Sequence, residues 1–369
     1  MSFSYKRFLL FPALIAASIT SAQEYYQPDT TVKVYAYGKE LTMPWCGGFN
    51  NPEFGMADLN RDGKPDLVAY ERNVGLSTFL HAGIGTDGIP IYKYAPRYAL
   101  NFPAVKGYMY LLDYNCDGIP DLFDRGDDGF GVYKGFYNAS NQLCFSFYRS
   151  LFYYNDLVSG GPANAYVNPS DIPGIADVDG DGDLDFVSYY ITGGYMYYHQ
   201  NMRVEDGLPC DSIRIRLDDR CWGKVYQNVD RAHQLGYSCD NSGLLRGVAE
   251  KRTHPGNATC LFDWDMDGDM DYLDGNIAFN DIQFIKNGKV EHSATIDTLV
   301  EQDSVWQSVG HRVNLPSWPA AFNIDIDQDG KKDLLISPNL GAGTENYKCI
   351  WYYKNNTTPG SPNWEFKSD

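Results

Sequence analysis

The chain has 369 residues, enough for one large domain or roughly two to three smaller ones with a buried core. Its 30 basic and 48 acidic side chains leave a formal net charge of −18, and such a surface would repel phosphates. Nucleic acids and anionic lipids are therefore not expected as partners. The aromatic content of 29 Tyr, 19 Phe and 7 Trp favours abundant β-structure, with carbohydrate-stacking platforms as the alternative explanation.

The N-terminus has the features of an export signal. Two basic residues, Lys6 and Arg7, precede the apolar run 8–19, and small residues then suit cleavage before Gln23. We expect residues 1–22 to be a signal peptide and the mature protein to be secreted. The apolar run is shorter than the ~20 residues that a membrane span needs, and no later segment approaches that length.

An aspartate-rich loop then recurs five times along the chain. The copies are loop 1 (58–66), loop 2 (113–121), loop 3 (177–185), loop 4 (263–271) and loop 5 (325–333). Positions 1, 5 and 9 of every loop are Asp and position 6 is Gly, whereas position 3 is Asn or Asp and position 2 is apolar or aromatic. Position 7 varies among Lys, Ile and Asp, so its side chain cannot be what the loop requires.

This spacing is the oxygen pattern of a calcium-binding loop. Side chains at positions 1, 3, 5 and 9 and the carbonyl at position 7 would bind the ion, and Gly at position 6 permits the sharp turn. Magnesium keeps its waters and zinc prefers His or Cys, so Ca2+ is the expected cofactor, about one ion per loop. A single loop of this kind could be an Asx-rich turn without metal, but the repetition argues against that alternative.

The expected metal ligands are the odd-numbered positions of each loop. They are Asp58, Asn60, Asp62, Lys64 and Asp66; Asp113, Asn115, Asp117, Ile119 and Asp121; Asp177, Asp179, Asp181, Asp183 and Asp185; Asp263, Asp265, Asp267, Asp269 and Asp271; and Asp325, Asp327, Asp329, Lys331 and Asp333. At position 7 the expected ligand is the backbone carbonyl, so Asp183 should resemble Lys64 and Lys331 in offering no side-chain oxygen to the ion.

Short apolar runs around the loops predict strands rather than helices. A strand enters each loop, a second leaves it, and a third follows after a turn, with enough residues left for a fourth. A helix–loop–helix calcium site would need Glu at position 12, which holds Ala69, Asp124, Ser188, Asp274 and Ile336. A four-stranded sheet repeated at this spacing predicts an all-β fold, a β-propeller of four-stranded blades with DxDxDG loops.

These residues resemble the FG-GAP/VCBS repeat, with Phe54-Gly55 before loop 1 as in the name of the repeat. The resemblance covers about residues 30–369 and implies an integrin-α-like calcium-binding propeller, in which the calcium loop joins two adjacent strands of one blade. Segments around loops 3 and 5 are similar to secreted repeat proteins of Bacteroidetes-type bacteria. Those generally end in a C-terminal sorting domain for surface export, which this chain lacks, so surface attachment would need a missing C-terminal region.

The resemblance also bears on the number of blades. Propellers of this family commonly have seven, so five loops in residues 23–369 lead us to expect an incomplete seven-bladed ring whose chain stops within a strand of the next blade. A closed ring is the alternative, either with degenerate blades or with residues 32–38 completing the last blade.

The longest interval between loops, from loop 3 to loop 4, contains a cysteine-bearing insertion at about residues 203–259. Eight cysteines without a CxxC pair indicate an oxidising compartment and disulfides rather than zinc. Cys210 and Cys221 bracket a short polar segment and are the first expected disulfide, and Cys239 with Cys260 is the second. The insertion serves either as a specific binding surface or as a staple that stabilises a long excursion.

The sequence is consistent with two functions. The first is a secreted or cell-surface calcium-binding propeller that acts as a binding or adhesion module for an extracellular protein or glycan, with calcium mainly structural. The alternative is a calcium-dependent polysaccharide lyase or glycoside hydrolase on the same scaffold. An enzyme is the less expected of the two, because the histidines are scattered, no known nucleophile or zinc motif occurs, and no catalytic residue stands out.

Overall fold

The computed structural model describes residues 32–36, 38–86, 88–156, 160–191, 193–227, 231–239, 256–308, 311–315, 318–340, 344 and 349–368. The expected signal peptide, residues 1–22, lies outside them. The chain divides into two compact units, Met1–Trp45 and Cys46–Asp369.

The described part of the first unit contains one small hairpin. Its strands β1 (Tyr35–Ala36) and β2 (Lys39–Glu40) pair with each other in a two-stranded sheet. The alternative in which residues 32–38 complete the last blade is therefore wrong, because β1 belongs to this two-stranded sheet and the last blade takes its four strands from residues 319–368.

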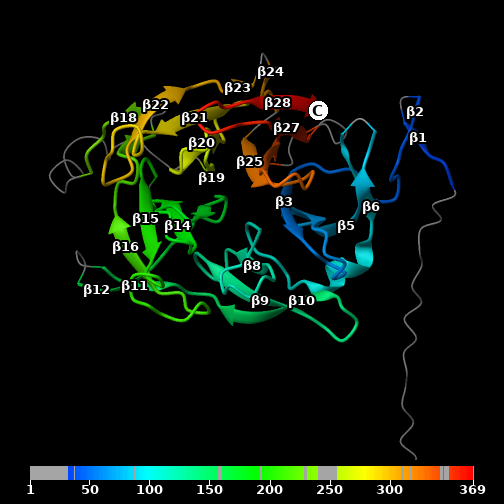
Figure 1. The fold of residues 1–369 in the computed structure, drawn as a ribbon, viewed down its shortest axis with the longest axis horizontal. Coiled ribbons are helices and arrows are strands. Elements are labelled where there is room, and N and C mark those ends of the chain that lie inside the picture. The colour runs from blue at the N-terminus through cyan, green and yellow to red at the C-terminus, as the bar shows by residue number, and fades with distance from the viewer. Residues whose placement is uncertain are drawn as a thin grey trace, which may run out of the picture. The chain divides into compact units, whose positions relative to one another are not determined.

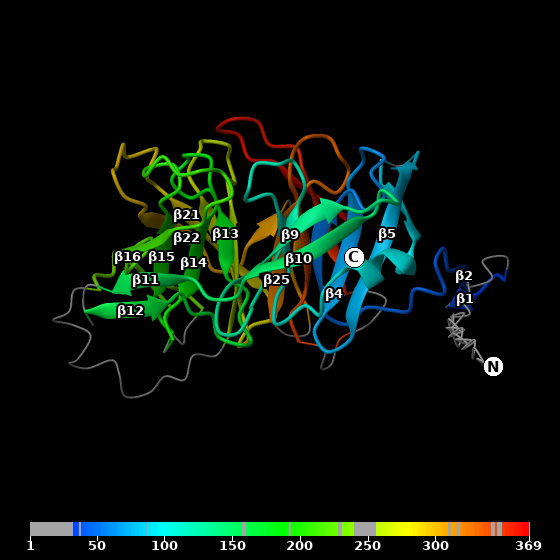
Figure 2. The same cartoon turned by 90° about the horizontal axis from the view of Figure 1, so that it is seen from below.

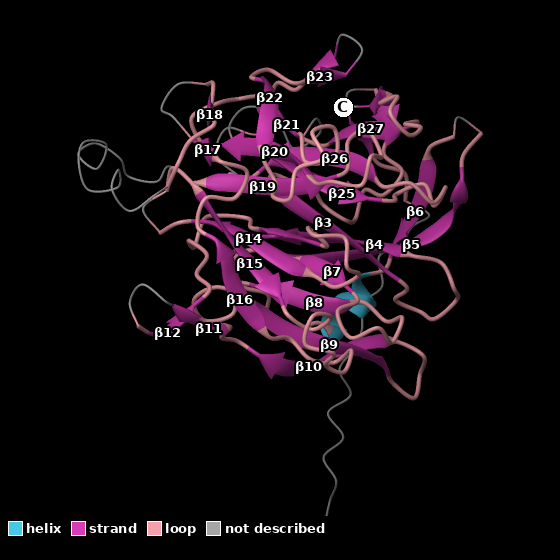
Figure 3. Cartoon of the chain, turned by 60° about the vertical axis from the view of Figure 1, so that its left-hand side comes forward, coloured by secondary structure: helices cyan, strands magenta, loops and turns pink. Residues whose placement is uncertain are grey.

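Five four-stranded antiparallel sheets make up the second unit and are arranged around a ring, which confirms the predicted β-propeller (Figure 1). Strands dominate, and the described residues contain a single helical element, the 3-10 helix η1 (Pro96–Asn101), drawn in cyan in Figure 3. Each sheet, or blade, consists of four strands that follow one another along the chain. The blades are blade 1, with β3 (Pro52–Ala57), β4 (Asp66–Glu71), β5 (Gly75–Ile84) and β6 (Pro90–Tyr94); blade 2, with β7 (Tyr110–Leu112), β8 (Asp121–Asp124), β9 (Gly131–Tyr137) and β10 (Leu143–Arg149); blade 3, with β13 (Gly174–Ala176), β14 (Asp185–Tyr189), β15 (Met196–Asn201) and β16 (Ile215–Asp219); blade 4, with β19 (Asn257–Phe262), β20 (Asp271–Asn276), β21 (Ile282–Asn287) and β22 (Leu299–Asp303); and blade 5, with β25 (Pro319–Ile324), β26 (Asp333–Pro338), β27 (Trp351–Asn355) and β28 (Trp364–Ser368).

Short two-stranded hairpins lie in the chain between consecutive blades. They are β11 (Tyr153–Asp156) with β12 (Gly161–Asn164), β17 (Val225–Tyr226) with β18 (Gln234–Leu235), and β23 (Gln307–Ser308) with β24 (His311–Arg312). Nothing in the repeat predicts them, since they fall outside the residues that the blades share.

Hydrophobic cores lie between neighbouring blades. One cluster combines Val68 of blade 1 with Leu122 of blade 2, and another combines Val187 of blade 3 with Tyr272 of blade 4. Position 2 of the loops enters these cores, because Leu59 belongs to the first cluster and Val178 to the second. This explains why position 2 is always apolar or aromatic: a buried side chain of that size contributes about 1.5–3 kcal/mol.

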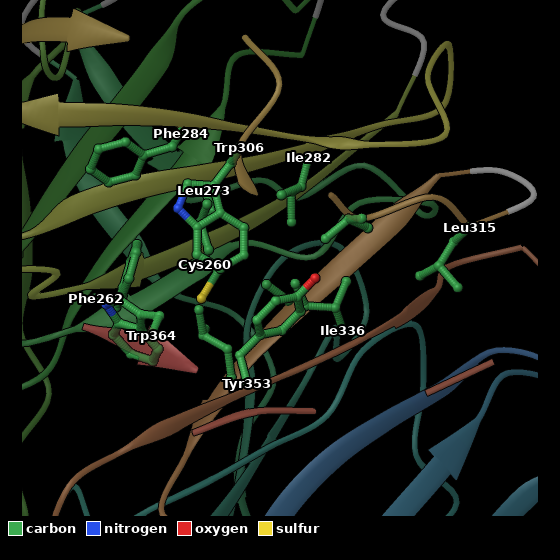
Figure 4. Packing of buried hydrophobic residues seen from close by; sticks show 13 residues of the cluster. Cys260, Phe262, Leu273, Ile282, Phe284, Trp306, Leu315, Ile336, Tyr353 and Trp364 are labelled. Carbon is green, nitrogen blue, oxygen red and sulfur yellow. The ribbon is translucent and has the colours of Figure 1, made fainter. Parts of the chain in front are cut away.

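Aromatic side chains fill the cluster between blades 4 and 5. Figure 4 shows Phe262, from the first strand of blade 4, beside Trp364, from the last strand of blade 5, and their ring centroids are 5.6 Å apart. Trp306, which precedes β23, lies 5.1 Å from the ring of Tyr353 in the same cluster. Much of the aromatic content thus serves the blade interfaces.

Blade 5 closes the ring against blade 1. The rings of Phe54 and Phe322, from the first strands of the two blades, lie 5.7 Å apart in an edge-to-face contact. The Ser337 hydroxyl donates to the carbonyl of Pro52 at 2.5 Å, and the Tyr92 hydroxyl donates to the carbonyl of Ile326 at 2.7 Å. The expectation of an incomplete seven-bladed ring is therefore wrong for this structure. Side-chain packing closes the five blades, and β28 supplies the fourth strand of blade 5 itself.

Both expected disulfides are also wrong. Cys116 of loop 2 pairs with Cys210, and Cys221 pairs with Cys239, while Cys260 is a buried free thiol. The reason is that residues 210–221 do not form a hairpin: they contain β16, the fourth strand of blade 3, which lies beside β15 in Figure 2. An extended strand rises about 3.3 Å per residue, so it keeps the two cysteines that flank it too far apart to bond.

Candidate metal centres in the five loops

The backbone follows the same path in all five loops. Each loop joins the first and second strands of its blade, and position 9 pairs with the residue before position 1, as Asp185 pairs with Ala176. Positions 4 and 6 are both left-handed, with φ of 60° at Cys116 and 78° at Gly118 in loop 2. Glycine meets that requirement at position 6 without steric cost. Position 4 holds Arg61, Cys116, Gly180, Met266 or Gln328, so its residue types did not reveal its conformation.

Carboxylates at positions 1 and 5 hold the turn by accepting backbone hydrogen bonds. In loop 3 the Gly182 N–H donates to Asp177 at 3.0 Å, and the Asp183 N–H donates to Asp181 at 3.0 Å. The equivalent bonds in the other four loops measure between 2.7 and 3.1 Å. Because each carboxylate oxygen has two lone pairs, these bonds leave acceptor capacity for a cation.

The aspartate at position 9 is fully buried in every loop and ties the loop to the third strand of its blade. Asp185 accepts from the Val178 N–H at 3.0 Å and from the Asn201 N–H at 2.7 Å. The third-strand bond recurs in the other blades at 2.8 Å, with donors His81, Gly135, Asn287 and Asn355. Burial raises the pKa of Asp185 to about 8, with a further contribution from the Asp179 carboxylate, while the backbone hydrogen bonds oppose this rise.

Loops 3, 4 and 5 each bring the carboxylates of positions 1, 3 and 9 together. In every case three carboxylate oxygens, one from each residue, lie within 4.8 Å of one another. The three groups are Asp177, Asp179 and Asp185; Asp263, Asp265 and Asp271; and Asp325, Asp327 and Asp333. The sequence predicted all nine residues as metal ligands, and the fold places each group in one small volume.

A second acidic group lies beside the first in loops 3 and 4. It consists of positions 3 and 5 with a glutamate that follows the third strand of the blade, Glu205 in blade 3 and Glu291 in blade 4. Neither glutamate was predicted as a ligand. Both glutamates follow the first Asp of their loop at the same interval in the sequence. This shared spacing could have identified them as ligands from the sequence alone.

Loops 1 and 2 differ because position 3 is Asn60 or Asn115. Among the described residues, no group of three acidic side chains meets in either loop. Asn60 accepts from the Asp62 N–H at 3.0 Å, as Asn115 does from Asp117. The other predicted ligands here are Asp58 and Asp66 in loop 1 and Asp113 and Asp121 in loop 2. Each loop thus offers three carboxylates and one amide oxygen.

On the third strand of each blade, one residue donates its N–H to the position-9 aspartate. The side chain of the residue just before that donor changes the charge near the loop. In blade 5 the Lys354 ammonium contacts Asp327 and lies 2.7 Å from Asp329. In blade 4 the Lys286 ammonium lies 2.8 Å from Asp265. In blade 3 the same place holds Gln200, a neutral amide, which donates to Asp179 at 2.6 Å. The third strand therefore brings a cation to the acidic groups of loops 4 and 5 but not to those of loop 3, where the cation, Arg203, lies beside Asp183 at position 7.

The side chain at position 7 has partners away from the acidic groups. Asp183 accepts from the Val204 N–H at 3.2 Å, and Asp269 accepts from the Val290 N–H at 2.9 Å. The Lys331 ammonium donates to the Thr357 carbonyl at 2.8 Å. In all three cases the partner follows the third strand of the same blade. That the carbonyls of Lys64, Ile119, Asp183, Asp269 and Lys331 bind an ion stays a prediction.

The acidic groups fit a hard cation. Asp181 Oδ2, Asp265 Oδ1 and Asp267 Oδ2 are buried and have no hydrogen-bond partner within the described chain. An unpaired buried carboxylate oxygen is costly, and a divalent cation beside it would remove that cost. Because the donors are all oxygens, they suit Ca2+ or a similar hard ion better than a softer metal.

A central cavity of about 640 Å3 lies at the first strands of all five blades. Its wall is mainly apolar, with Phe54, Leu111, Ile175, Leu261 and Phe322 each contributed by a different blade. Loops 1, 3, 4 and 5 also reach it, for example at the position-1 residues of the last three. Four of the five loops therefore border the cavity directly.

Comparison with known proteins adds little to this geometry. No protein-family model matches the chain, and no curated protein matches its sequence. One similar solved structure is an Agrocybe aegerita lectin described by its specific recognition of non-reducing terminal N-acetylglucosamine. It is 15% identical, the match covers 87% of this chain and 80% of the lectin, and the TM-score is 0.38. Such a score carries no argument about ligand or activity, so the function must be inferred from the residues of this chain.

Proposed function

We propose that the chain is a secreted, calcium-stabilised β-propeller that works as a binding or adhesion module. The observation that carries the calcium assignment is the convergence of three carboxylates within 4.8 Å in each of loops 3, 4 and 5. Carboxylates that lie so close together repel one another, and a bound divalent cation turns that repulsion into attraction.

A structural role for the ion follows from the contacts of the loops with neighbouring blades. The Tyr137 hydroxyl of blade 2 donates to the Asp58 carbonyl of loop 1 at 2.9 Å. The Gly360 N–H of blade 5 donates to the Asp265 carbonyl of loop 4 at 2.8 Å. An ion that holds the shape of a loop therefore also holds the loop against the next blade.

Export is supported by the N-terminal sequence and by the two disulfides, which persist in oxidising compartments. No helix in the described part of the chain is long and apolar enough to cross a membrane. A rigid ring that carries many connecting segments suits recognition of an extracellular protein or glycan, because binding residues lie preferentially on loops positioned by a rigid scaffold.

Thermal unfolding of the full chain in calcium and in excess EGTA tests the proposal. A ligand present at 100 times its Kd stabilises the folded state by about 2.7 kcal/mol per site, so emptying several sites should lower Tm by roughly 10 °C. Magnesium should not restore the lost stability, because it fits a flexible set of many oxygens poorly.

A triple variant, Asp179→Asn, Asp265→Asn and Asp327→Asn, provides the matched control. These changes keep the side-chain shape but remove one carboxylate from each acidic group. EGTA should lower the Tm of this variant by less than it lowers the Tm of the unmodified chain, because loops 3, 4 and 5 then have the amide at position 3 that loops 1 and 2 already have. If EGTA left the Tm of the unmodified chain unchanged, the calcium assignment would be wrong.

A further inference from the structure

A second pocket, of about 490 Å3, lies away from the loops between the hairpin β11–β12 and blade 3. We call it the tyrosine pocket and define it by Tyr153 and Tyr154 of the hairpin and by Tyr190, Tyr197 and His199 of blade 3. Pockets of about 300–1,000 Å3 that combine aromatic walls with a few polar groups are typical of small-molecule sites. The calcium sites do not use any of these side chains.

Aromatic faces form the wall of the tyrosine pocket. Tyr190 lies 5.1 Å from Tyr195 with nearly parallel rings, at 12°, and 5.1 Å from Tyr197 at 40°. Tyr153 of the hairpin also lines the pocket and is 59% exposed. This exposed ring, together with the stacked tyrosines, presents apolar aromatic surface to a ligand.

His199 is the polar group among these rings, and it is 1% exposed. Neither ring nitrogen has a hydrogen-bond partner within the described chain, although such a buried group normally has one. Burial lowers the pKa of His199 to about 3; the Phe186 backbone opposes this shift, and the Arg220 charge adds to it. The imidazole is therefore neutral and offers one donor and one acceptor to a ligand.

An ion pair fixes the wall. The Arg220 guanidinium, which follows β16, pairs with Asp156 of the hairpin and so joins the two sides of the pocket. The same guanidinium lies 5.6 Å from the ring centre of Tyr197 and donates to its hydroxyl at 3.4 Å. The charges beside the Tyr197 wall of the pocket therefore already have partners.

This arrangement selects among ligand charges. The positive charge of Arg220 already lies over the Tyr197 ring, so a cationic ligand that seeks aromatic faces would be repelled there. An anionic ligand would meet the Asp128 carboxylate, which lines the pocket and pairs with Arg125, on a protein whose net charge is −18. A neutral ligand with apolar faces and polar edges matches the site best.

We propose that the tyrosine pocket binds a neutral saccharide, with the C–H face of a sugar ring against the tyrosines and a hydroxyl on His199. The inference rests on the proposed function as a binding module and assigns that module a site and a ligand class. It does not depend on calcium binding, because the site shares no residue with the loops.

Binding of neutral oligosaccharides to the full chain in calcium tests this. The probes are immobilised glucose, galactose, mannose and N-acetylhexosamine oligomers, and each positive is then titrated calorimetrically. Tyr153→Ala should weaken binding by about tenfold, because it removes one exposed stacking face. His199→Phe should weaken binding at least as much without lowering Tm, since it removes a buried group that has no partner.

Phe147→Ala is the matched control, because Phe147 is 62% exposed on blade 2 and does not line the pocket. It should leave the affinity unchanged. Failure of every neutral probe to bind, or an affinity in Tyr153→Ala and His199→Phe that equals that of the unmodified chain, would overturn the inference. Competition at this pocket by a trimethyl-lysine peptide would also overturn it, in favour of a cationic ligand.

The two proposals fail separately. If EGTA lowers the Tm but no neutral saccharide binds, the calcium assignment stands and this inference is wrong. If a saccharide binds but EGTA leaves the Tm unchanged, this inference stands and the calcium assignment is wrong.

Discussion

Loops 2 and 3 have the same backbone but are stabilised by different means. Loop 2 has three carboxylates, and its position 4 is Cys116, which bonds covalently to Cys210. Loop 3 has five aspartates and gathers Glu205 as well. Both partners, Cys210 and Glu205, come from one turn of blade 3, residues 202–214, so this turn serves two loops at once.

The repeat determines the backbone path of each loop, whereas the neighbouring turn determines whether a disulfide or an additional carboxylate stabilises it. The turn contacts loop 3 through Arg203, which donates to the Gly182 carbonyl at 2.9 Å. It also contacts blade 2, because Arg149 donates to the Ile213 carbonyl at 3.1 Å. Loop 2 should therefore depend on its disulfide, and loop 3 on its ion.

The largest expected effect is that of removing the disulfide of loop 2. Cys116→Ser with Cys210→Ser should lower the free energy of unfolding by about 4 kcal/mol in chemical denaturation, because the bond closes a span of 94 residues. The loss should be similar with and without calcium. The control is Cys221→Ser with Cys239→Ser, which opens a span of 18 residues and should cost about 3 kcal/mol. A loss that appeared only in calcium would contradict the division between the two loops.

The next effect concerns position 5. Asp181→Ala removes a predicted ligand that belongs to the second acidic group of loop 3, and Asp117→Ala is the equivalent change in loop 2. Losing an outer partner of a metal site already costs roughly 10- to 100-fold in affinity, so losing Asp181 should cost at least that much. Calorimetric calcium titration should show a smaller loss for Asp117→Ala. Equal losses would mean that the additional carboxylates of loop 3 do not matter.

A smaller effect is expected from Glu205→Gln. It removes one charge from the acidic group of Asp179 and Asp181 while keeping the shape of the turn. Calcium affinity of loop 3 should fall by about tenfold, because affinity follows the number of charged ligands. Glu291→Gln should act in the same way on loop 4. If neither change affected the titration, the glutamates would be neighbours of the ion site rather than members of it.

The smallest effect is expected at position 7. Asp183→Asn keeps an oxygen that can accept from the Val204 N–H, and the predicted ligand at this position is the backbone carbonyl. The calcium affinity should change by less than about threefold, as expected for a group outside the coordination shell. Asp183→Lys would be a poorer test. It would place an ammonium next to the Arg203 guanidinium, which lies 3.5 Å from the Asp183 carboxylate. A large loss in Asp183→Asn would place this side chain on the ion.

Much of the site was readable from the sequence, because loop ligands are local. Asp177, Asp179 and Asp185 lie close in the chain, and the hairpin between two strands brings them together wherever the blade sits. Glu205 was missed because it reaches the loop from the far end of the third strand. The sequence did not single out His199 among the scattered histidines, because its burial depends on contacts with a hairpin from another part of the chain, such as the ring of Tyr154.

The sequence by itself determined the blade. Five spaced copies of one loop, each between apolar strand patterns, predicted four-stranded sheets, because hydrogen bonding between consecutive strands is local and repeats with the pattern. Only the tertiary structure decided how many blades close the ring, which cysteines pair and where the tyrosine pocket lies. Those features depend on contacts between residues far apart in the chain, such as Phe54 with Phe322 and Cys116 with Cys210, and no local pattern records such contacts.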